Sequence, residues 1–209
     1  MEADEYDTAF FDKRAKLVHY RPEVATLNNL EFDHADIYAD IKAIQTQFHH
    51  FVRTIPGKGT IVSNGADNRL EAVLDMGCWS KLERFSEKEG MDWQVRSDEP
   101  DGSVLTFLYK GAEVGTMSWS QFGRHNAMNA CAAVGAAVAA GVEPGIAVEA
   151  LASFKGVKRR MELIGDQGGI RVYSDFAHHP TAIRLTLEGL RRNVGNARVL
   201  VGIEPRSNT

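Results

Sequence analysis

Two adjacent histidines, His178 and His179, follow a short apolar segment and precede a proline in the stretch 170–181, IRVYSDFAHHPT. An imidazole can bind a metal, transfer a proton or fill a turn. Neighbouring side chains of an extended segment point in opposite directions, so this pair is a poor bidentate metal site. Pro180 suits the first turn of a helix, where its missing N–H has no intrahelical partner to lose. We therefore expect His178 to face a cleft and His179 to pack or to cap the helix.

Asp175 precedes the histidine pair, and a basic segment, 155–160 (KGVKRR), precedes the strand that leads to it. A carboxylate at a strand exit can bond ribose hydroxyls in nucleotide-binding α/β folds. The basic segment lacks apolar periodicity, so we predict an interdomain linker. Its Arg159 and Arg160 can clamp a phosphate when two domains close, or they can be solvated, and the residues leave both interpretations open.

His125, Asn126 and Asn129 lie together in GRHNAMN, at the start of a long alanine-rich segment. Asn126 and Asn129 are three residues apart and would share one face of a helix. An amide both donates and accepts hydrogen bonds, so such a pair can bind the edge of a nucleotide base. An asparagine at a helix start can also act as a cap, which is the alternative here.

Two polar clusters could bind a cation. The first opens the chain and contains Glu2, Asp4, Glu5 and Asp7; the second follows a predicted strand and contains Asn28, Asp33, His34 and Asp36. Carboxylate oxygens suit Mg²⁺, which usually shares its coordination shell with substrate phosphates. The alternatives are a solvated acidic loop and a turn that ends in a helix cap at Asp36. If these groups converged with the histidine pair, a metal-dependent hydrolase that needs no ATP would be a competing interpretation.

The segments that must position these groups alternate between strand and helix patterns. We predict strands at 24–28 and 59–63 and helices at 37–55 and 68–76. This β-α-β-α order predicts an α/β domain with a largely parallel, doubly wound sheet. Gly57–Thr60 resembles part of a phosphate-binding loop, but it lacks the GK[ST] dipeptide and precedes a strand, so we predict a turn.

The pattern changes near Trp93. We predict short antiparallel strands over 93–119 with a hairpin at Lys110–Gly111, then helices at 125–140 and from Pro144. Beyond the linker we predict a hairpin around Gln167–Gly169, a helix at 180–192 and a strand at 198–203. These last elements would begin a second α/β domain, so we place the domain boundary between residues 156 and 157.

The composition is that of a globular protein. Of 209 residues 44% are hydrophobic, and 28 acidic residues face 24 basic ones, so nucleic-acid and anionic-membrane partners are not expected. The longest apolar run, from Ala130, is too short to span a bilayer, and no secretory segment follows Met1. Cys78 and Cys131 lack metal-binding spacing, which suits a reduced, cytoplasmic setting. Because both ends adjoin strand-like or polar sequence, we interpret the chain as a piece of a longer one.

Five motifs in this order resemble the Mur ligase family: EADE, NNLEFDHAD, GRHNAMNACAA, the basic linker and SDFAHHPTAI. Members of that family use ATP to form amide bonds in cytoplasmic peptidoglycan precursors. They have a UDP-sugar domain, a central ATPase domain with a mixed sheet and flanking helices, and a Rossmann-like C-terminal domain. The resemblance implies that residues 1–156 are most of the central domain without its phosphate loop, and that residues 157–209 begin the C-terminal domain. Such a piece is expected to bind ATP weakly and to be inactive alone.

The resemblance also implies roles for individual residues. Glu2 and His34 would bind Mg²⁺, while His125, Asn126 and Asn129 would bind the adenine of ATP, Asp175 its ribose and Arg160 its phosphates. His178 would act beside the cleft, and Arg206, Ser207 and Asn208 would contact the incoming peptide. Several members carry a carbamylated lysine as a further Mg²⁺ ligand. His49 and His50 stand in that region here, so an imidazole or a water replaces it, or these histidines pack.

The family reaction forms an amide through an acyl phosphate. The carboxylate of UDP-N-acetylmuramate attacks the γ-phosphate of ATP, and an amine then attacks the activated carbonyl and expels phosphate. The stretches EADEYDTAFFDKR, GCWS and EPRSNT are most similar to members that accept the recycled tripeptide L-alanyl-γ-D-glutamyl-meso-diaminopimelate. Members that accept free L-alanine share most of these motifs, so the choice of acceptor rests on resemblance alone.

Overall fold

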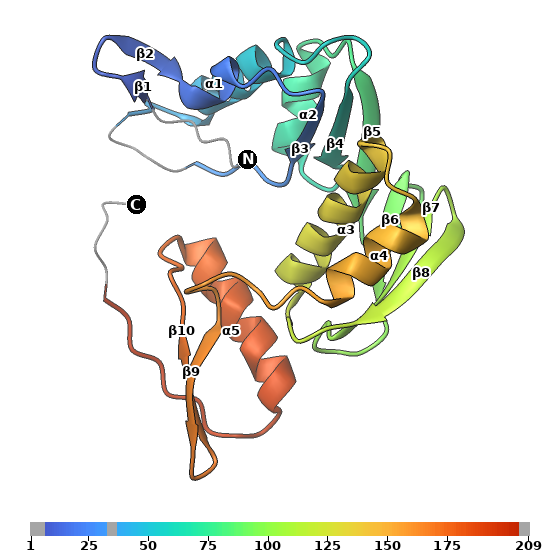
Figure 1. Ribbon diagram of the computed structural model, residues 1–209. Coiled ribbons are helices and arrows are strands. Elements are labelled where there is room, and N and C mark those ends of the chain that lie inside the picture. Colours follow the sequence, from blue (N-terminus) through green and yellow to red (C-terminus); the bar gives the residue numbers. More distant parts are fainter. Residues whose placement is uncertain (1–6, 33–36, 205–209) are drawn as a thin grey trace.

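The computed structural model describes residues 7–32 and 37–204 of the chain (Figure 1). Its centre is a six-stranded sheet in the order β3-β4-β5-β6-β7-β8. The strands are β3 (Val24–Leu27), β4 (Thr60–Asn64), β5 (Lys81–Ser86), β6 (Trp93–Ser97), β7 (Val104–Tyr109) and β8 (Ala112–Ser118). Strands β3 to β6 pair in parallel and β6 to β8 pair antiparallel, so the sheet is mixed and the predicted α/β class is confirmed.

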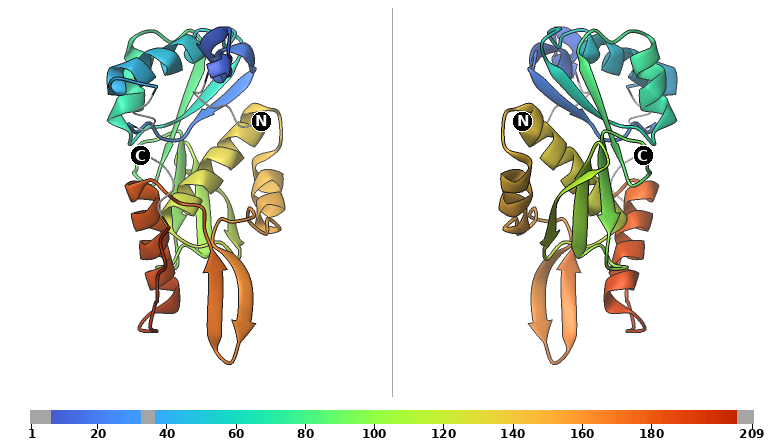
Figure 2. Two further views of the ribbon diagram at one scale, coloured as in Figure 1. Left: turned by 90° about the vertical axis from the view of Figure 1, so that its left-hand side faces the viewer. Right: turned by 90° about the vertical axis from the view of Figure 1, so that its right-hand side faces the viewer.

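Helices cover both faces of this sheet. Helices α1 (Ile41–Val52) and α2 (Asn68–Asp75) lie on one face, and α3 (Arg124–Ala139) and α4 (Pro144–Ala152) lie on the other (Figures 1 and 2). Successive side chains of a strand point to opposite faces. Ile61 is therefore buried in the apolar core beneath α1 and α2, whereas Val62 is buried in the core beneath α3 and α4.

Helix α3 is the alanine-rich helix predicted at 125–140. Its small side chains let it lie close to the sheet, since a Cβ on Gly135 would be 3.1 Å from Cγ1 of Val62 and 3.2 Å from Cδ1 of Trp93. The helix contacts β3, β4, β5 and β6, and it thereby spans the parallel part of the sheet. Neither α3 nor any other helix within residues 7–32 and 37–204 is long and apolar enough to cross a membrane.

The two ends of the chain add smaller units. The N-terminal one is a hairpin of β1 (Asp7–Ala9) and β2 (Asp12–Ala15) followed by the 3₁₀ helix η1 (Lys16–His19). The C-terminal one consists of the hairpin β9 (Glu162–Gln167)–β10 (Ile170–Ser174) and of α5 (Pro180–Val194), which extend together from one end of the central unit (Figure 2). Helix α5 packs closely there, because a Cβ on Gly189 would be only 2.9 Å from Cα of Gly123.

The predicted turns are confirmed. Lys110–Gly111 connects β7 to β8, and Gly168 and Gly169 connect β9 to β10. Gly57–Thr60 is a turn that leads into β4, in which the N–H of Gly59 donates to the carbonyl of Pro56 at 2.8 Å. The prediction of a turn, and not a phosphate-binding loop, at Gly57–Thr60 is therefore confirmed.

The start of one helix and one strand of the central sheet differ from the predictions. Helix α1 begins after Asp40, whose carboxylate accepts a hydrogen bond from the N–H of Ala43 at 2.9 Å. The predicted cap, Asp36, lies outside the described residues. Strand β5 is not among the predicted strands; charged side chains at Lys81, Glu83 and Arg84 interrupt its apolar alternation.

The strand predicted at 198–203 is wrong. In the part of the chain that the structure describes, this segment pairs with no strand, and Leu200 and Ile203 are 79% and 61% exposed. An apolar run becomes a strand only where a neighbouring strand satisfies its backbone groups. Strands β9 and β10 pair only with each other and offer the segment no ladder.

Candidate functional site

The predicted adenine-binding residues meet the carboxyl ends of β3 and β4 at the start of α3. Asn28, which directly follows β3, donates from Nδ2 to Oδ1 of Asn129 at 3.2 Å. Asn64, the last residue of β4, donates from Nδ2 to the carbonyl of Asn28 at 2.8 Å. This chain of amides joins two strand ends to α3. The bond from Asn28 uses the amide oxygen of Asn129 and leaves its NH₂ group for another partner.

Asn126 has the opposite amide orientation. Its Nδ2 donates to the carbonyl of Phe122 at 2.8 Å, at the start of the helix. This bond uses the amide nitrogen and not the acceptor Oδ1 of Asn126. Asn126 and Asn129 lie on one face of α3 and together present an acceptor and a donor.

His125 lies beside them in the first turn of α3. Its Nδ1 is buried and has no hydrogen-bond partner within the described residues. Burial lowers the pKa of His125; the Asp175 carboxylate partly opposes this effect, and the Arg160 guanidinium adds to it. The lowered pKa favours the neutral imidazole. Three residues before His125, the Phe122 ring lies edge-on to the Tyr173 ring of β10 at 6.4 Å between centroids, so the start of α3 lies against the C-terminal part that carries Asp175.

Asp175 connects the loop after β10 to the basic linker. Its Oδ2 accepts from the N–H of Met161 at 2.8 Å, and its Oδ1 accepts from the N–H of Ala177 at 2.7 Å. Next to it, the N–H of Phe176 donates to the carbonyl of Arg159 at 2.8 Å. The Arg159 guanidinium lies over the Phe176 ring, 5.0 Å from its centroid. The linker and the loop are thus joined along several residues.

His178 and His179 have different environments, as expected for neighbouring side chains that point in opposite directions. His178 is exposed, with Nδ1 3.1 Å from the carbonyl oxygen of Phe176 and its ring edge-on to the Phe176 ring. His179 is the N-cap of α5, and its Nδ1 accepts from the N–H of Thr181 at 3.3 Å. Pro180 occupies the first turn of that helix. The prediction that His179 packs or caps is therefore confirmed.

Glu31 links the two parts of the chain and was not among the predicted site residues. Its Oε2 accepts from Oγ1 of Thr181 at 2.8 Å and lies 3.7 Å from Nδ1 of His179. Glu31 belongs to the motif NNLEFDHAD, but the residues in that motif that suggested a metal site were Asp33 and His34. Because Thr181 is 150 residues away along the chain, no local pattern indicates this contact.

The remaining predicted site residues lie outside the described residues: Glu2, His34, Arg206, Ser207 and Asn208. Their roles in Mg²⁺ and peptide binding stay predictions. Between residues 7 and 204, apart from 33–36, no group of three or more histidines, cysteines and carboxylates could hold a metal ion. The histidine pair alone does not make the metal centre that a hydrolase would require.

His49 and His50 lie in the last turn of α1. The His49 ring lies 6.2 Å, centroid to centroid, from Trp79, which comes just before β5. Since β5 runs parallel to β4, Trp79 marks the amino-terminal edge of the sheet, opposite the strand ends that carry Asn28 and Asn64. This position favours packing over metal ligation for His49.

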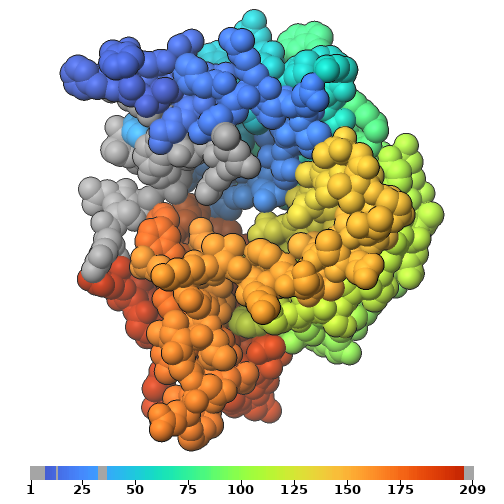
Figure 3. All heavy atoms as spheres, in the orientation of Figure 1, coloured from blue at the N-terminus to red at the C-terminus, as the bar shows by residue number. Residues whose placement is uncertain are grey.

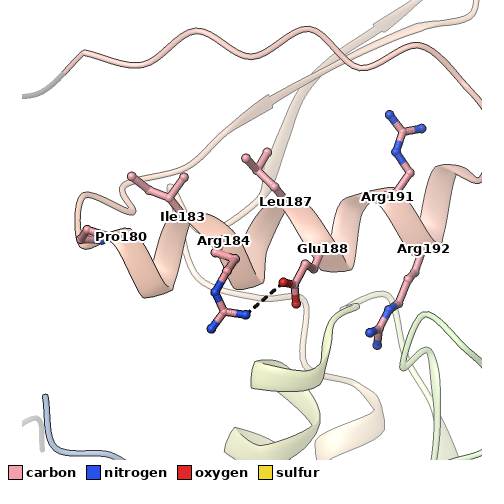
Figure 4. Close-up of a pocket in the computed structure, with 7 residues that line it drawn as sticks. All are labelled: Pro180, Ile183, Arg184, Leu187, Glu188, Arg191 and Arg192. Atoms are coloured by element: carbon pink, nitrogen blue, oxygen red, sulfur yellow. Dashed lines mark hydrogen bonds and ion pairs between the residues drawn. The ribbon is translucent and has the colours of Figure 1, made fainter.

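A groove of about 750 Å³ runs along α5 (Figure 4). Its lining residues are Pro180, Ile183, Arg184, Leu187, Glu188, Arg191 and Arg192. Arg184 and Glu188 form an ion pair along the helix at 3.0 Å. The predicted ATP-binding residues do not line this groove. In the space-filling view the molecule is also hollowed between the orange C-terminal part and the blue and yellow parts of the central unit (Figure 3).

Comparison with known proteins gives these residues a family context. The sequence profile of the Mur ligase middle domain matches residues 1–137, and that of the Mur ligase glutamate ligase domain matches residues 159–207. The motif with His125, Asn126 and Asn129 falls within the first match. Arg160 and Asp175 fall within the second.

Similar proteins are found over the whole chain. The UDP-N-acetylmuramate--L-alanyl-gamma-D-glutamyl-meso-2,6-diaminoheptandioate ligase of Escherichia coli (strain K12) is 51% identical over 100% of this chain and 46% of its own length. The UDP-N-acetylmuramate--L-alanine ligase of Paenarthrobacter aurescens (strain TC1) is 36% identical over 98% of this chain and 43% of its own. The crystal structure of a murein peptide ligase from Psychrobacter arcticus 273-4 is 49% identical, with a TM-score of 0.73, over 100% of this chain and 43% of its own. The chain thus spans about half the length of these relatives.

Proposed function

Because this chain belongs to the Mur ligase family, we propose that it is part of an enzyme that uses ATP to join UDP-N-acetylmuramate to the tripeptide L-alanyl-γ-D-glutamyl-meso-diaminopimelate. One structural observation supports the proposal: the start of α3, which carries His125, Asn126 and Asn129, lies against the C-terminal part, where the Phe122 ring is edge-on to the Tyr173 ring at 6.4 Å between centroids. The higher identity to the tripeptide ligase than to the L-alanine ligase supports the choice of acceptor. Residues 1–156 would form most of the ATP-binding domain, and residues 157–209 would begin the C-terminal ligase domain.

Asn126 and Asn129 would bind the adenine edge of ATP. Adenine presents an amino donor next to a ring-nitrogen acceptor. The Oδ1 acceptor of Asn126 and the NH₂ donor of Asn129 complement these two groups. The buried Nδ1 of His125 has no partner in the described part of the chain, which is expected of an atom that a ligand satisfies. Asp175 would bond the ribose through the lone pairs that its two backbone bonds leave available.

The phosphates of ATP would lie toward the linker. When bound, ATP supplies the γ-phosphoryl group and Mg²⁺ neutralises its oxygens. Arg160 would offset the negative charge of the transferred group while the muramate carboxylate attacks. The other proposed contacts are Glu2 and His34 to Mg²⁺, His178 to the cleft, and Arg206, Ser207 and Asn208 to the peptide. Such an enzyme would act in the cytoplasm, where it would reuse peptide recovered from the cell wall.

The test is phosphate release by the full-length enzyme supplied with ATP, UDP-N-acetylmuramate and one of two acceptors. We expect release with the tripeptide and little release with free L-alanine. The reverse result would assign the protein to the L-alanine ligases. Release with neither acceptor would refute a ligase of this kind, and ATP-independent hydrolysis would then be tested.

The role of Arg160 can be tested in the same assay. Arg160→Ala should lower kcat by about a hundredfold, the order of loss seen when one preorganised charge-stabilising group is removed. Lys158→Ala is the matched control, because Lys158 is an exposed cation of the same linker. Its kcat should change by less than about threefold. Equal losses of kcat in both variants would show that Arg160 has no specific role.

A further inference from the structure

The linker between the two parts has a strained backbone. Within six residues, Gly156, Arg159 and Met161 have φ angles of 92°, 60° and 46°. Glycine adopts this left-handed region freely, whereas Arg159 and Met161 do so only when their surroundings enforce it. Arg160 lies between these two residues, so their left-handed conformations decide where its side chain is directed.

The Asp175 carboxylate helps to hold this backbone in place through hydrogen bonds. One carboxylate oxygen holds the N–H of Met161 at 2.8 Å, and the other holds the N–H of Ala177 at 2.7 Å. On the other side of Arg160, the carbonyl of Arg159 accepts from the N–H of Phe176, also at 2.8 Å. The two strained residues that flank Arg160 are therefore fastened to Asp175 and to its neighbour.

We propose that Asp175 is a positioning residue for Arg160: its carboxylate holds the linker 156–161 in the strained conformation that fixes the backbone on both sides of Arg160. This role is separate from a ribose contact, since it uses the backbone bonds that the structure shows. The catalytic consequence rests on the proposed function, whereas the effect on the linker does not.

Trypsin cleavage tests the effect on the linker directly. Lys155, Lys158, Arg159 and Arg160 are exposed, and trypsin must draw the segment into an extended conformation to cleave beside them, so the cleavage rate reports how firmly the linker is held. Asp175→Ala should raise the cleavage rate there about tenfold, the loss expected for one hydrogen bond to a charged group. In the Asp175→Ala background, Met161→Gly should lower the cleavage rate several-fold, because glycine adopts the left-handed conformation without strain.

The matched control is Asp166→Ala. Asp166 is an exposed carboxylate of the hairpin that precedes Asp175, paired in register with Arg171 near the turn between β9 and β10. Its cleavage rate should stay within about twofold of the parent protein. The proposal is overturned if Asp175→Ala is cleaved no faster than Asp166→Ala, or if Met161→Gly gives no protection in the Asp175→Ala background.

Kinetics of the full-length ligase separate positioning from ribose binding. A positioning role predicts that Asp175→Ala lowers kcat, leaves KM for ATP within about threefold, and is partly rescued by Met161→Gly. A ribose contact alone predicts a raised KM for ATP with little change in kcat and no rescue, and that result would overturn the proposal. If the parent enzyme shows no ligation, the proposed function fails, and the cleavage experiment still decides whether Asp175 holds the linker.

Discussion

Replacement of the buried Glu83 by alanine should destabilise the fold strongly. Glu83 is only 3% exposed, and its oxygens accept from Nε1 of Trp93 at 2.7 Å and from the hydroxyl of Tyr109 at 3.1 Å, with Nζ of Lys81 at 2.7 Å. Glu83→Ala would leave the N–H of the fully buried Trp93 without an acceptor, which costs about 1–3 kcal/mol. The small cavity and the lost Tyr109 bond add roughly 1 kcal/mol. We therefore expect about 3 kcal/mol less unfolding free energy, a large part of the usual total of about 5–15 kcal/mol.

Urea unfolding of the parent protein, Glu83→Ala and Glu83→Gln measures this effect. Glutamine keeps an acceptor for Trp93 and should cost only about 1 kcal/mol. Burial raises the pKa of Glu83, but the bonds from Lys81, Trp93 and Tyr109 outweigh it and leave that pKa below its usual value. A carboxyl whose folded pKa is lowered stabilises the fold above its unfolded pKa, and this stabilisation is lost as the pH falls through the folded pKa. The difference between parent and Glu83→Gln should thus shrink on acidification. A loss below about 1 kcal/mol for Glu83→Ala would refute the reasoning.

Three further predictions concern the contacts around the site. Gly189→Ala should destabilise the packing of α5 by about 1–3 kcal/mol, because the new Cβ would press on the backbone of Gly123, whereas Gly165→Ala, whose Cβ would be in ordinary contact with Val172 at 3.8 Å, should be neutral in thermal unfolding. Asn129→Asp should weaken ADP binding to the full-length enzyme at least about tenfold in calorimetry, since it removes the NH₂ donor; unchanged affinity would exclude the proposed adenine contact. Thr181→Val, which removes the bond to Glu31, should lower the unfolding free energy by about 1 kcal/mol, and no change would show that this contact does not hold α5.

Local patterns were sufficient for most of the fold. Apolar periodicity, glycine turns and Pro180 located α2 to α5 and five of the six strands of the central sheet, because these signals depend on residues near one another. Neighbouring side chains of an extended segment point in opposite directions, and this rule alone predicts different environments for His178 and His179. Capping was less specific, since both Asp36 and Asp40 are suitable N-caps and only the position of the first helical turn distinguishes them.

Long-range pairing limited the rest. β5 carries a buried carboxylate that looks misplaced until Trp93 and Tyr109 provide its hydrogen bonds. The segment 198–203 has the composition of a strand but no partner among the described residues, so its composition misleads. Glu31 was missed for the same reason, because its role depends on Thr181, a residue remote in sequence. Residue type can suggest a chemical group, but it cannot supply the partner that gives the group a role.

The contacts that hold α5 lie next to the residues proposed to bind the nucleotide. Glu31 follows β3 in the loop that also carries Asn28, and Gly123 comes two residues before His125. A nucleotide that touches the start of α3 on one side and Arg160 on the other can make both contacts only while the two parts are docked. Docking and nucleotide binding therefore stabilise each other by the same free energy, whichever occurs first. If the proposed nucleotide site is correct, contacts far from the reacting atoms, such as Glu31 to Thr181, would contribute to nucleotide affinity without touching the nucleotide.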